Sequence, residues 1–245
     1  MILIDRHVHT TFSDGAQTPE EMVRAAVEKG MKTIGFSDHS YTFFDESYCM
    51  KKADIPAYKN CIAQLKEKYK DQIEILCGIE QDFYSKEPAE GYDYIIASVH
   101  YIKLGEEYVP VDETPEDLVN AAERFFDGDI YAVAETYFDT VAKIKEADII
   151  GHIDLITKFQ GIRPLFDTAH PRYMAAARRA ADALLRLGVP FEINTSPLYR
   201  KAKTDPYPET PLMEYIRDRG GKFVLSGDCH CKEMLCFSFE KYKNV

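Results

Sequence analysis

The 245-residue chain lacks the long apolar runs that a membrane-spanning helix requires, about 18 consecutive apolar residues. It also lacks low-complexity stretches and linkers rich in Gly, Ser or Pro, so no disordered region or domain boundary is indicated. The first residues, Met-Ile-Leu-Ile-Asp-Arg-His, do not follow the pattern of a secretory signal, which needs a basic segment and an apolar core. We therefore expect a single domain spanning residues 1–245, a cytoplasmic location and no membrane partner.

Positive charge is scarce, because 30 Lys and Arg residues stand against 41 Asp and Glu residues and give a formal net charge of −11. Such a surface repels a phosphate backbone, so nucleic acid is not an expected partner. A small phosphorylated substrate is compatible with this charge, since bound cations and one or two arginines can reverse the field locally.

Cysteine is also infrequent, with six residues in the chain. Without a secretory signal, these are expected to be reduced thiols rather than a disulfide framework. Cys229 and Cys231 flank His230 and could suggest a thiolate metal site. No matching pair occurs elsewhere, which favours thiols that pack at a strand end.

Short apolar runs alternate with amphipathic helical patterns along the chain, as expected of seven β-then-α units. The runs are continuous and rich in Ile, Val and Phe, which is typical of strands buried on both faces of a parallel sheet. We predict an α/β fold in which these strands close into a barrel of the TIM type. The predicted strands are Ile2–Asp5, Thr33–Ser37, Ile73–Glu80, Tyr94–Val99, Ile149–Ile153, Phe191–Asn194 and Lys222–Ser226.

Two helix starts are clear in the sequence. Thr18-Pro19-Glu20-Glu21 has the pattern of a capping box with proline at the first helical position, and this helix should end near Gly30. Thr114-Pro115-Glu116-Asp117 repeats the signal. Residues 115–147 are too many for one barrel helix and contain Asp127-Gly128-Asp129, so two helices joined by a turn are predicted.

Histidine is rare but not randomly placed, since six of the seven histidines end or follow a predicted strand. In a parallel barrel the carboxyl ends of the strands share one rim, where active sites are built. Any one of these residues could be a surface residue or a helix cap, but independent roles do not predict a common rim. The residues at this rim are His7, His9, His39, His100, His152 and His230, with the carboxylates Asp14, Asp38, Glu80, Asp154 and Asp228.

A metal centre explains this placement. In an extended segment, His7 and His9 point to the same side and can reach one cation. Imidazole and carboxylate ligands suit Zn²⁺, Fe²⁺ or Mn²⁺, and the number of candidates is sufficient for two or three divalent ions. A purely structural metal site is disfavoured, because a structural zinc site is closed with four ligands.

The motifs in this order resemble the PHP (polymerase and histidinol phosphatase) family over nearly the entire chain. They are Asp5-Arg6-His7-Val8-His9-Thr10, Phe36-Ser37-Asp38-His39, Gly78-Ile79-Glu80, Ala97-Ser98-Val99-His100, Gly151-His152-Ile153-Asp154 and Ser226-Gly227-Asp228-Cys229-His230.

The resemblance implies a distorted (β/α)7 barrel with a trinuclear metal site. His7, His9, Glu80 and Asp228 would hold the first metal ion, and Glu80 would bridge to a second ion held by His100 and His152. Asp14, His39 and His230 would hold the third. Asp228, His230 and Glu80 would also be the catalytic residues.

A narrower resemblance concerns the substrate. Phe191-Glu192-Ile193-Asn194-Thr195-Ser196, Tyr199-Arg200-Lys201 and Asp154-Leu155-Ile156-Thr157-Lys158-Phe159 are similar to segments of the histidinol phosphatases of this family. This implies hydrolysis of L-histidinol phosphate to L-histidinol and phosphate, a step of histidine biosynthesis. The alternative is a phosphatase or phosphodiesterase of the same family that acts on nucleotides or phosphotyrosine.

Arg163 and Arg200 are the candidates for phosphate binding. Both lie just beyond predicted strands, and a guanidinium group presents a planar fork that matches phosphate oxygens. The alternative is that both are ordinary surface arginines. The sequence leaves open the oligomeric state and the acidic residue that would meet the amine of the substrate.

Overall fold

The computed structural model describes residues 3–244 and contains a seven-stranded sheet in the order β1-β2-β3-β4-β7-β8-β9. All seven strands correspond to predicted ones, although Ile2 of the first lies outside the described residues. The strands are β1 (Ile4–Asp5), β2 (Thr33–Phe36), β3 (Glu74–Asp82), β4 (Tyr94–Ser98), β7 (Ile149–Ile150), β8 (Phe191–Asn194) and β9 (Phe223–Ser226).

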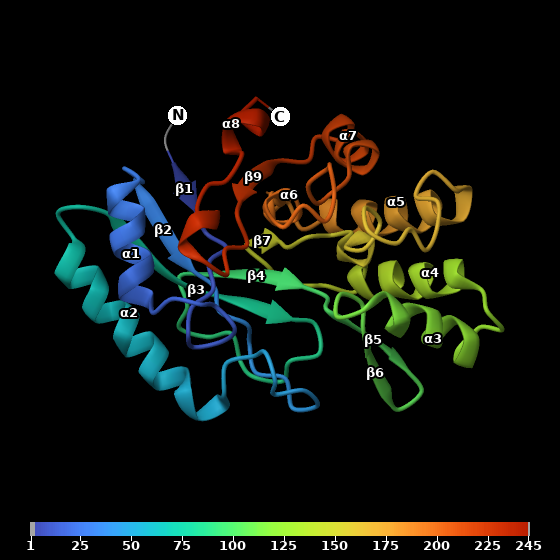
Figure 1. The fold of residues 1–245 in the computed structure, drawn as a ribbon, viewed down its shortest axis with the longest axis horizontal. Coiled ribbons are helices and arrows are strands. Elements are labelled where there is room, and N and C mark those ends of the chain that lie inside the picture. The colour runs from blue at the N-terminus through green and yellow to red at the C-terminus, as the bar shows by residue number, and fades with distance from the viewer. Residues whose placement is uncertain (1–2, 245) are drawn as a thin grey trace. The chain divides into compact units, whose positions relative to one another are not determined.

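The helices largely follow the predicted pattern (Figure 1). Both capping boxes are present, at Thr18 and at Thr114. The span from Pro115 forms two helices separated at the predicted turn. The helices are α1 (Pro19–Glu28), α2 (Ile55–Tyr69), α3 (Pro115–Phe125), α4 (Ile130–Val141), α5 (Pro171–Leu185), α6 (Ser196–Tyr199), α7 (Thr210–Asp218) and α8 (Phe239–Tyr242), with 3-10 turns at Lys52–Asp54, Leu155–Thr157 and Lys232–Met234.

Two connections differ from the predicted β-then-α units. The chain passes from β3 to β4 through residues 83–93 without a helix, because Pro88 and Gly91 interrupt the segment and Gly91 has a φ of 74°. After β4 an antiparallel hairpin forms from β5 (Tyr101–Leu104) and β6 (Glu107–Pro110), with Gly105 in the turn at a φ of 61°. The prediction missed this hairpin.

The contacts of the chain divide it into two compact units. The first comprises the chain up to Ile96, Asn194–Ser196 and the chain from Val224, and the second comprises Ala97–Ile193 and Pro197–Phe223. That residues 1–245 form a single domain stays a prediction. Within residues 3–244, no helix is long and apolar enough to cross a membrane.

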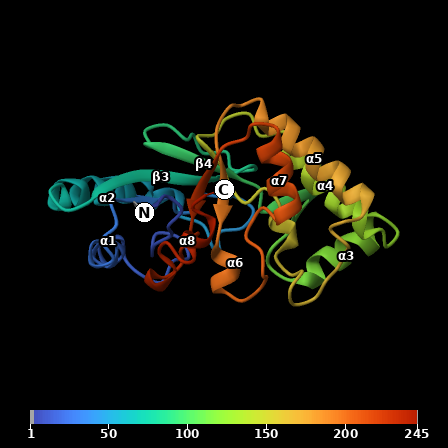
Figure 2. The same cartoon turned by 90° about the horizontal axis from the view of Figure 1, so that it is seen from above.

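The first unit is organised around a buried tyrosine. The hydroxyl of Tyr94 in β4 shares its single hydrogen between two carbonyl acceptors, that of Arg6 just after β1 (2.6 Å) and that of Phe36 in β2 (2.9 Å). Gly35 and Gly78 provide the space for this side chain, because a Cβ at Gly35 would lie 2.5 Å from the Tyr94 hydroxyl oxygen and a Cβ at Gly78 would lie 2.3 Å from the ring. Helix α1 packs on β2 and helix α2 packs on β3, and Figure 2 shows α2 running alongside β3.

In the second unit, α3, α4, α5 and α7 pack in succession, each against the next. Between Tyr173 and Leu184, the buried face of α5 consists of small side chains, Ala176, Ala177, Ala180 and Ala181, which allow neighbouring helices to approach closely. A larger residue at these positions would overpack the interface at a cost of about 1–3 kcal/mol.

Candidate metal centre

In the first unit, backbone hydrogen bonds align the predicted metal-binding segments with one another in two pairs. The N–H of His9 donates to the carbonyl of Cys229 and the N–H of Cys229 donates to that of His7, both at 2.9 Å. This parallel bridge between Val8 and Cys229 aligns the His-x-His segment after β1 with the Asp-x-His segment after β9. A second parallel bridge pairs His39, after β2, with Glu80 of β3.

The first donor group is His7, His9 and Asp228, whose donor atoms all lie within 4.8 Å of one another. The Nε2 of His9 lies 3.2 Å from Oδ1 of Asp228, and the Nε2 of His7 lies 3.9 Å from the same oxygen. Glu80 is next to both histidines, with Oε2 at 3.3 Å from His7 Nε2 and 3.6 Å from His9 Nε2. All four side chains are almost fully buried.

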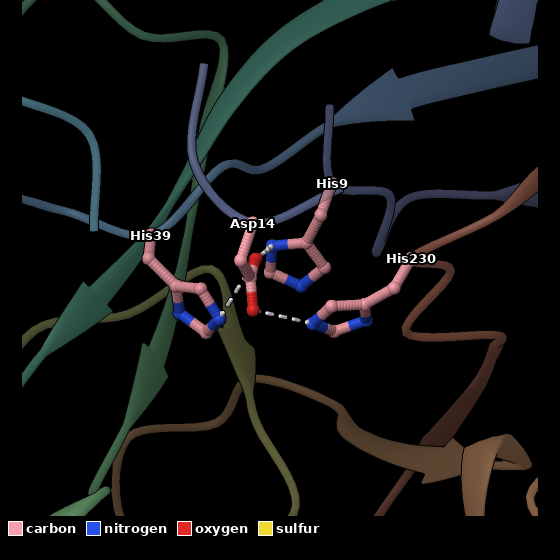
Figure 3. Close-up of side chains that lie close together, drawn as sticks. All are labelled: His9, Asp14, His39 and His230. Carbon is pink, nitrogen blue, oxygen red and sulfur yellow. Dashed lines mark hydrogen bonds and ion pairs between the residues drawn. The ribbon is translucent and has the colours of Figure 1, made fainter. Parts of the chain in front are cut away.

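The second donor group is His9, Asp14, His39 and His230, which also lie within 4.8 Å of one another by their donor atoms. Figure 3 shows the three imidazoles arranged around the Asp14 carboxylate. Oδ2 of Asp14 is 3.0 Å from His230 Nε2, and Oδ1 is 3.7 Å from His39 Nε2 and 3.8 Å from His9 Nδ1. His9 thus belongs to both donor groups.

The hydrogen bonds of His230 show that a cation fits the second group. The carbonyl of Asp228 can only accept, so its 3.0 Å contact with His230 Nδ1 places a hydrogen on that nitrogen. A neutral ring then presents a lone pair to the Asp14 carboxylate from Nε2. Two acceptors 3.0 Å apart require a cation, either a proton or a metal ion, to bring them together.

The state of His9 agrees with a metal ligand. Within residues 3–244, neither ring nitrogen of His9 has a hydrogen-bond partner of good geometry, although the ring is fully buried. Burial, with His230 and His39 nearby, lowers the pKa of His9 to about 3, so the imidazole is neutral at neutral pH. A buried neutral imidazole with nitrogens aimed at two carboxylates is a suitable donor for a divalent ion.

The carboxylates of both groups are held in the ionised form. Burial acts to raise the pKa of Asp228, but His7, His9 and His230 outweigh it and keep that pKa well below its usual value. Burial likewise acts to raise the pKa of Asp14, and His39 and His230 lower it by more. Metal ligands must be deprotonated, so both residues are ready to bind a cation.

Asp38 has a different role from its neighbours at the strand ends. Its fully buried carboxylate accepts hydrogen bonds from the backbone N–H and hydroxyl of Thr10 and from those of Ser13, the shortest at 2.7 Å from Ser13 Oγ. Gly15 completes the turn, because a Cβ there would lie 2.5 Å from the backbone of His9 and of Thr10. Asp38 therefore anchors the loop that presents Asp14.

Asp228 is oriented from two sides. Its backbone is left-handed, with a φ of 46°, a conformation that Asp tolerates better than most residues. Its Oδ2 accepts hydrogen bonds from Asn194 Nδ2 at 3.2 Å and from Ser196 Oγ at 3.1 Å, which leaves Oδ1 toward His7 and His9. Asn194 and Ser196 were not predicted as site residues, although Asn194 ends a predicted strand and Ser196 lies two residues beyond it.

A buried carboxylate also holds the segment that bears Asp228 and His230. Asp5 is fully buried and accepts hydrogen bonds from the N–H groups of Gly227 at 3.0 Å and Cys236 at 3.1 Å. Burial raises the pKa of Asp5, and its hydrogen bonds act in the opposite direction. All six cysteines, including Cys229, are free.

The second unit contains the other two predicted ligands, His100 and His152. Both are buried and their ring centroids lie 5.0 Å apart. The backbone N–H of His152 donates to Glu192 Oε1 at 2.6 Å, which fixes the segment after β7 to β8. Asp154 lies two residues on, and its Oδ2 accepts from the N–H of Glu209 at 2.8 Å, so it fastens the loop before α7.

The two predicted phosphate-binding arginines also lie in the second unit. Arg163 follows the 3-10 turn Leu155–Thr157, and its guanidinium is half-exposed and paired with Glu116 at the start of α3. Arg200 follows α6 and is exposed. Their role in phosphate binding stays a prediction.

Comparison with known proteins agrees with this site. Residues 5–196 match the family described as "PHP domain". A protein of Deinococcus radiodurans named "Probable histidinol-phosphatase" is 30% identical over 97% of this chain and 90% of its own length.

Two crystal structures are similar to this chain over most of their length. HisK of Listeria monocytogenes has a TM-score of 0.82 at 20% identity and covers 98% of this chain and 99% of its own. The histidinol phosphate phosphatase of Lactococcus lactis, in complex with zinc, L-histidinol and phosphate, has a TM-score of 0.75 at 23% identity over 98% of this chain and 91% of its own. The fold is a distorted (β/α)7 barrel, which confirms the predicted fold class.

Proposed function

Because the chain belongs to the PHP domain family, we propose that it is a metal-dependent phosphatase that hydrolyses L-histidinol phosphate to L-histidinol and phosphate. The observation that carries the proposal is the pair of donor groups that share His9, one with His7 and Asp228 and the other with Asp14, His39 and His230. The relative of Deinococcus radiodurans supports the substrate through its name, and the protein of Lactococcus lactis through its bound ligands.

Three sets of residues would hold the metal ions. His7, His9, Glu80 and Asp228 form the first set, and Asp14, His39 and His230 form the third. The second set, Glu80 with His100 and His152, rests on the family resemblance. Divalent ions bound to such residues lower the pKa of a water molecule toward neutrality and neutralise the nonbridging oxygens of a phosphate. Zinc is supported by the complex of the relative, while iron and manganese stay predictions.

The side chains of this protein prepare the site before substrate arrives. Asn194 and Ser196 donate hydrogen bonds to Oδ2 of Asp228. Its Oδ1 is thereby directed toward the two imidazoles, 3.2 Å from His9 Nε2 and 3.4 Å from His230 Nδ1. Asp228 thereby connects the two donor groups. Asp228, His230 and Glu80 are the proposed catalytic residues because their polar atoms lie where these groups meet.

Arg163 and Arg200 would bind the phosphoryl oxygens. A guanidinium group donates two parallel hydrogen bonds to a phosphate, and both arginines offset the acidic balance of the chain locally. Arg163 would exchange its pairing with Glu116 for the phosphate, and Arg200 would contribute from its exposed position after α6.

The test is a phosphate-release screen combined with elemental analysis of the same protein preparation. Histidinol phosphate should give the highest kcat/KM among histidinol phosphate, ethanolamine phosphate, nucleoside monophosphates and phosphotyrosine. Faster turnover of a nucleotide or of phosphotyrosine would instead support the alternative within the family. Full activity in protein shown to contain no metal would refute the metal-dependent mechanism.

A further inference from the structure

Two loops at the ends of β2 and β3 contain an unusual number of aromatic side chains that are not buried. The loop of residues 40–50 contains Tyr41, Phe43, Phe44 and Tyr48, and the loop of residues 82–87 contains Phe83 and Tyr84. Phe43 is 43% exposed and the other five rings are half-buried. We call these six residues the aromatic cluster. Exposed aromatic rings in a short stretch frequently indicate a binding surface.

The two loops are fixed to each other and to the metal-binding segments. The hydroxyl of Ser85 donates to the carbonyl of Tyr41 at 2.7 Å, and that of Ser40 accepts from the N–H of Asp82 at 2.9 Å. The N–H of Ser40 donates to the carbonyl of Glu80 at 2.9 Å. The aromatic cluster is therefore held in place by the same backbone that carries His39 and Glu80.

The rings form contacts that begin at a proposed metal ligand. The rings of Tyr48 and His39 pack edge to face, with centroids 4.9 Å apart and planes at 74°. In the same two loops, Phe44 makes edge-to-face contacts with Phe43 at 5.2 Å and with Tyr84 at 6.4 Å. Such perpendicular packing gives each ring a defined orientation, and Phe43, Phe44, Tyr48 and Tyr84 all keep part of their surface exposed to solvent.

The chemistry of the cluster favours a cationic, aromatic ligand. The ammonium group of Lys86 already lies over the ring of Phe43, 4.0 Å from its centre. The loop of residues 40–50 also carries the acidic residues Asp45 and Glu46 and no Lys or Arg, whereas Glu87 of the other loop is paired with Lys52 at 2.8 Å, so the negative charge of Asp45 and Glu46 favours an amine over a second phosphate. The imidazole of histidinol can stack on a ring, and its ammonium group can interact with a ring face or with these carboxylates.

We propose that Tyr48, Phe44 and Tyr84 bind the imidazole-bearing end of the substrate and thereby select it among phosphate monoesters. This rests on the proposed function, because it assigns the organic half of the substrate to the aromatic cluster and the phosphate to the metal ions. It predicts a selectivity that depends on aromatic rings in the loops of residues 40–50 and 82–87.

The test compares two substrates in four variants. Histidinol phosphate and ethanolamine phosphate share the phosphate ester and the amine, and ethanolamine phosphate lacks the ring. In Tyr48→Leu, Phe44→Leu and Tyr84→Leu, the ratio of kcat/KM for histidinol phosphate to kcat/KM for ethanolamine phosphate should fall about five- to thirty-fold, as the loss of one stacking or cation–π contact predicts. Tyr48→Phe keeps the ring and should keep the ratio of the parent.

The control is Phe125→Leu, which removes an aromatic ring that is 37% exposed at the end of α3. This variant should leave both kcat/KM values unchanged. Metal content and thermal melting of every variant report whether the fold and the metal centre are intact.

The outcomes separate the two proposals. A parent that hydrolyses histidinol phosphate, combined with three leucine variants of unchanged ratio, overturns the role of the aromatic cluster and leaves the proposed function standing. A ratio that falls equally in Tyr48→Phe and Tyr48→Leu also overturns it for Tyr48, since the ring would not be responsible. A parent that does not hydrolyse histidinol phosphate overturns both.

Discussion

Individual residues of the metal centre divide into those that offer donor atoms and those that orient them. Asp38 and His39 are adjacent in the sequence, but Asp38 accepts hydrogen bonds from Thr10 and Ser13 while His39 contacts Asp14 and Glu80. A carboxylate next to a predicted ligand in the sequence can thus hold a different loop in place. The same holds for Asp5, which fixes the segment of Asp228 without contributing a donor to the two groups.

Replacement of Asp38 should displace Asp14. Asp38→Ala leaves the buried N–H of Thr10 and the partly buried N–H of Ser13 without their acceptor, which should cost roughly 2–4 kcal/mol of unfolding free energy. The metal content of the protein should fall, because the loop carrying Asp14 loses its anchor. Elemental analysis and denaturant unfolding measure both effects.

Two matched variants identify the cause. Asp38→Asn keeps one acceptor oxygen and Ser13→Ala removes a single hydroxyl donor, so both should be milder than Asp38→Ala. An Asp38→Ala protein with the stability and metal content of the parent would show that the hydrogen bonds to Thr10 and Ser13 do not position Asp14.

Removal of the Arg200 guanidinium should impair catalysis while the metal content stays that of the parent. A charge-assisted hydrogen bond contributes about 1.5–3 kcal/mol, so Arg200→Ala and Arg163→Ala should each lose roughly ten- to a hundred-fold in kcat/KM. Arg200→Lys should recover little, because a point charge does not replace a bidentate fork. Steady-state kinetics on histidinol phosphate measure the losses, and parent-like values in both alanine variants would make these ordinary surface residues.

At the scale of elements, local sequence signals were sufficient to predict a helix or strand where the interactions that stabilise it are themselves local. The capping boxes at Thr18 and Thr114 satisfy the first N–H groups of their helices within four residues, so pattern and structure agree. The hairpin β5–β6 and the connection of residues 83–93 depend on tight turns and on neighbouring elements. The periodicity of the apolar residues did not indicate either one.

The contact between α1 and α2 should depend on pH. Glu20 of α1 accepts hydrogen bonds from Lys68 at 2.8 Å, Arg24 at 2.6 Å and Tyr69 at 3.1 Å, and these lower its pKa to about 2 from an ordinary 4.5. A carboxyl group whose pKa is lowered by folding stabilises the protein above its unfolded pKa. That contribution is lost as the pH falls from about 4.5 through about 2.

Glu20→Gln should therefore lower the Tm at pH 7, and the difference from the parent should shrink as the pH approaches 2. Thermal melts of both proteins across this pH range measure the difference in Tm. Because the parent and the variant are compared at each pH, the effect of acid on the rest of the chain cancels. Glu67→Gln is the control, because Glu67 pairs with Lys70 of the following turn and not with another helix. A Tm difference that does not change with pH would exclude ionisation of Glu20 as its source.

At the scale of the whole molecule, metal ions should link stability to activity. Buried histidines and carboxylates in the two donor groups carry charge and lone pairs that a cation would satisfy. Dialysis against a chelator should abolish hydrolysis and lower the Tm by roughly 8–16 °C, the shift expected for a ligand present at about a thousand times its Kd. Zn²⁺, Mn²⁺ or Fe²⁺ should restore both.

The chelator experiment needs activity and melting to be measured on the same samples. Activity that survives in protein shown by elemental analysis to be free of metal would contradict the proposed function. Loss of activity with an unchanged Tm would instead show that the metal ions do not contribute to stability.

The sequence by itself determined the seven strands, the capped helices and the donor types at the strand ends, because periodicity and capping depend on residues close together in the chain. Only the tertiary structure decided that His9 serves two donor groups, that Asp38 anchors the loop of Asp14 and that Asn194 and Ser196 orient Asp228. Several of these relations join residues far apart in the chain, such as Thr10 and Asp38, which are 28 positions apart, and Asn194 and Asp228, which are 34 apart. Their distances follow from the packing and register of whole strands, which no local pattern contains.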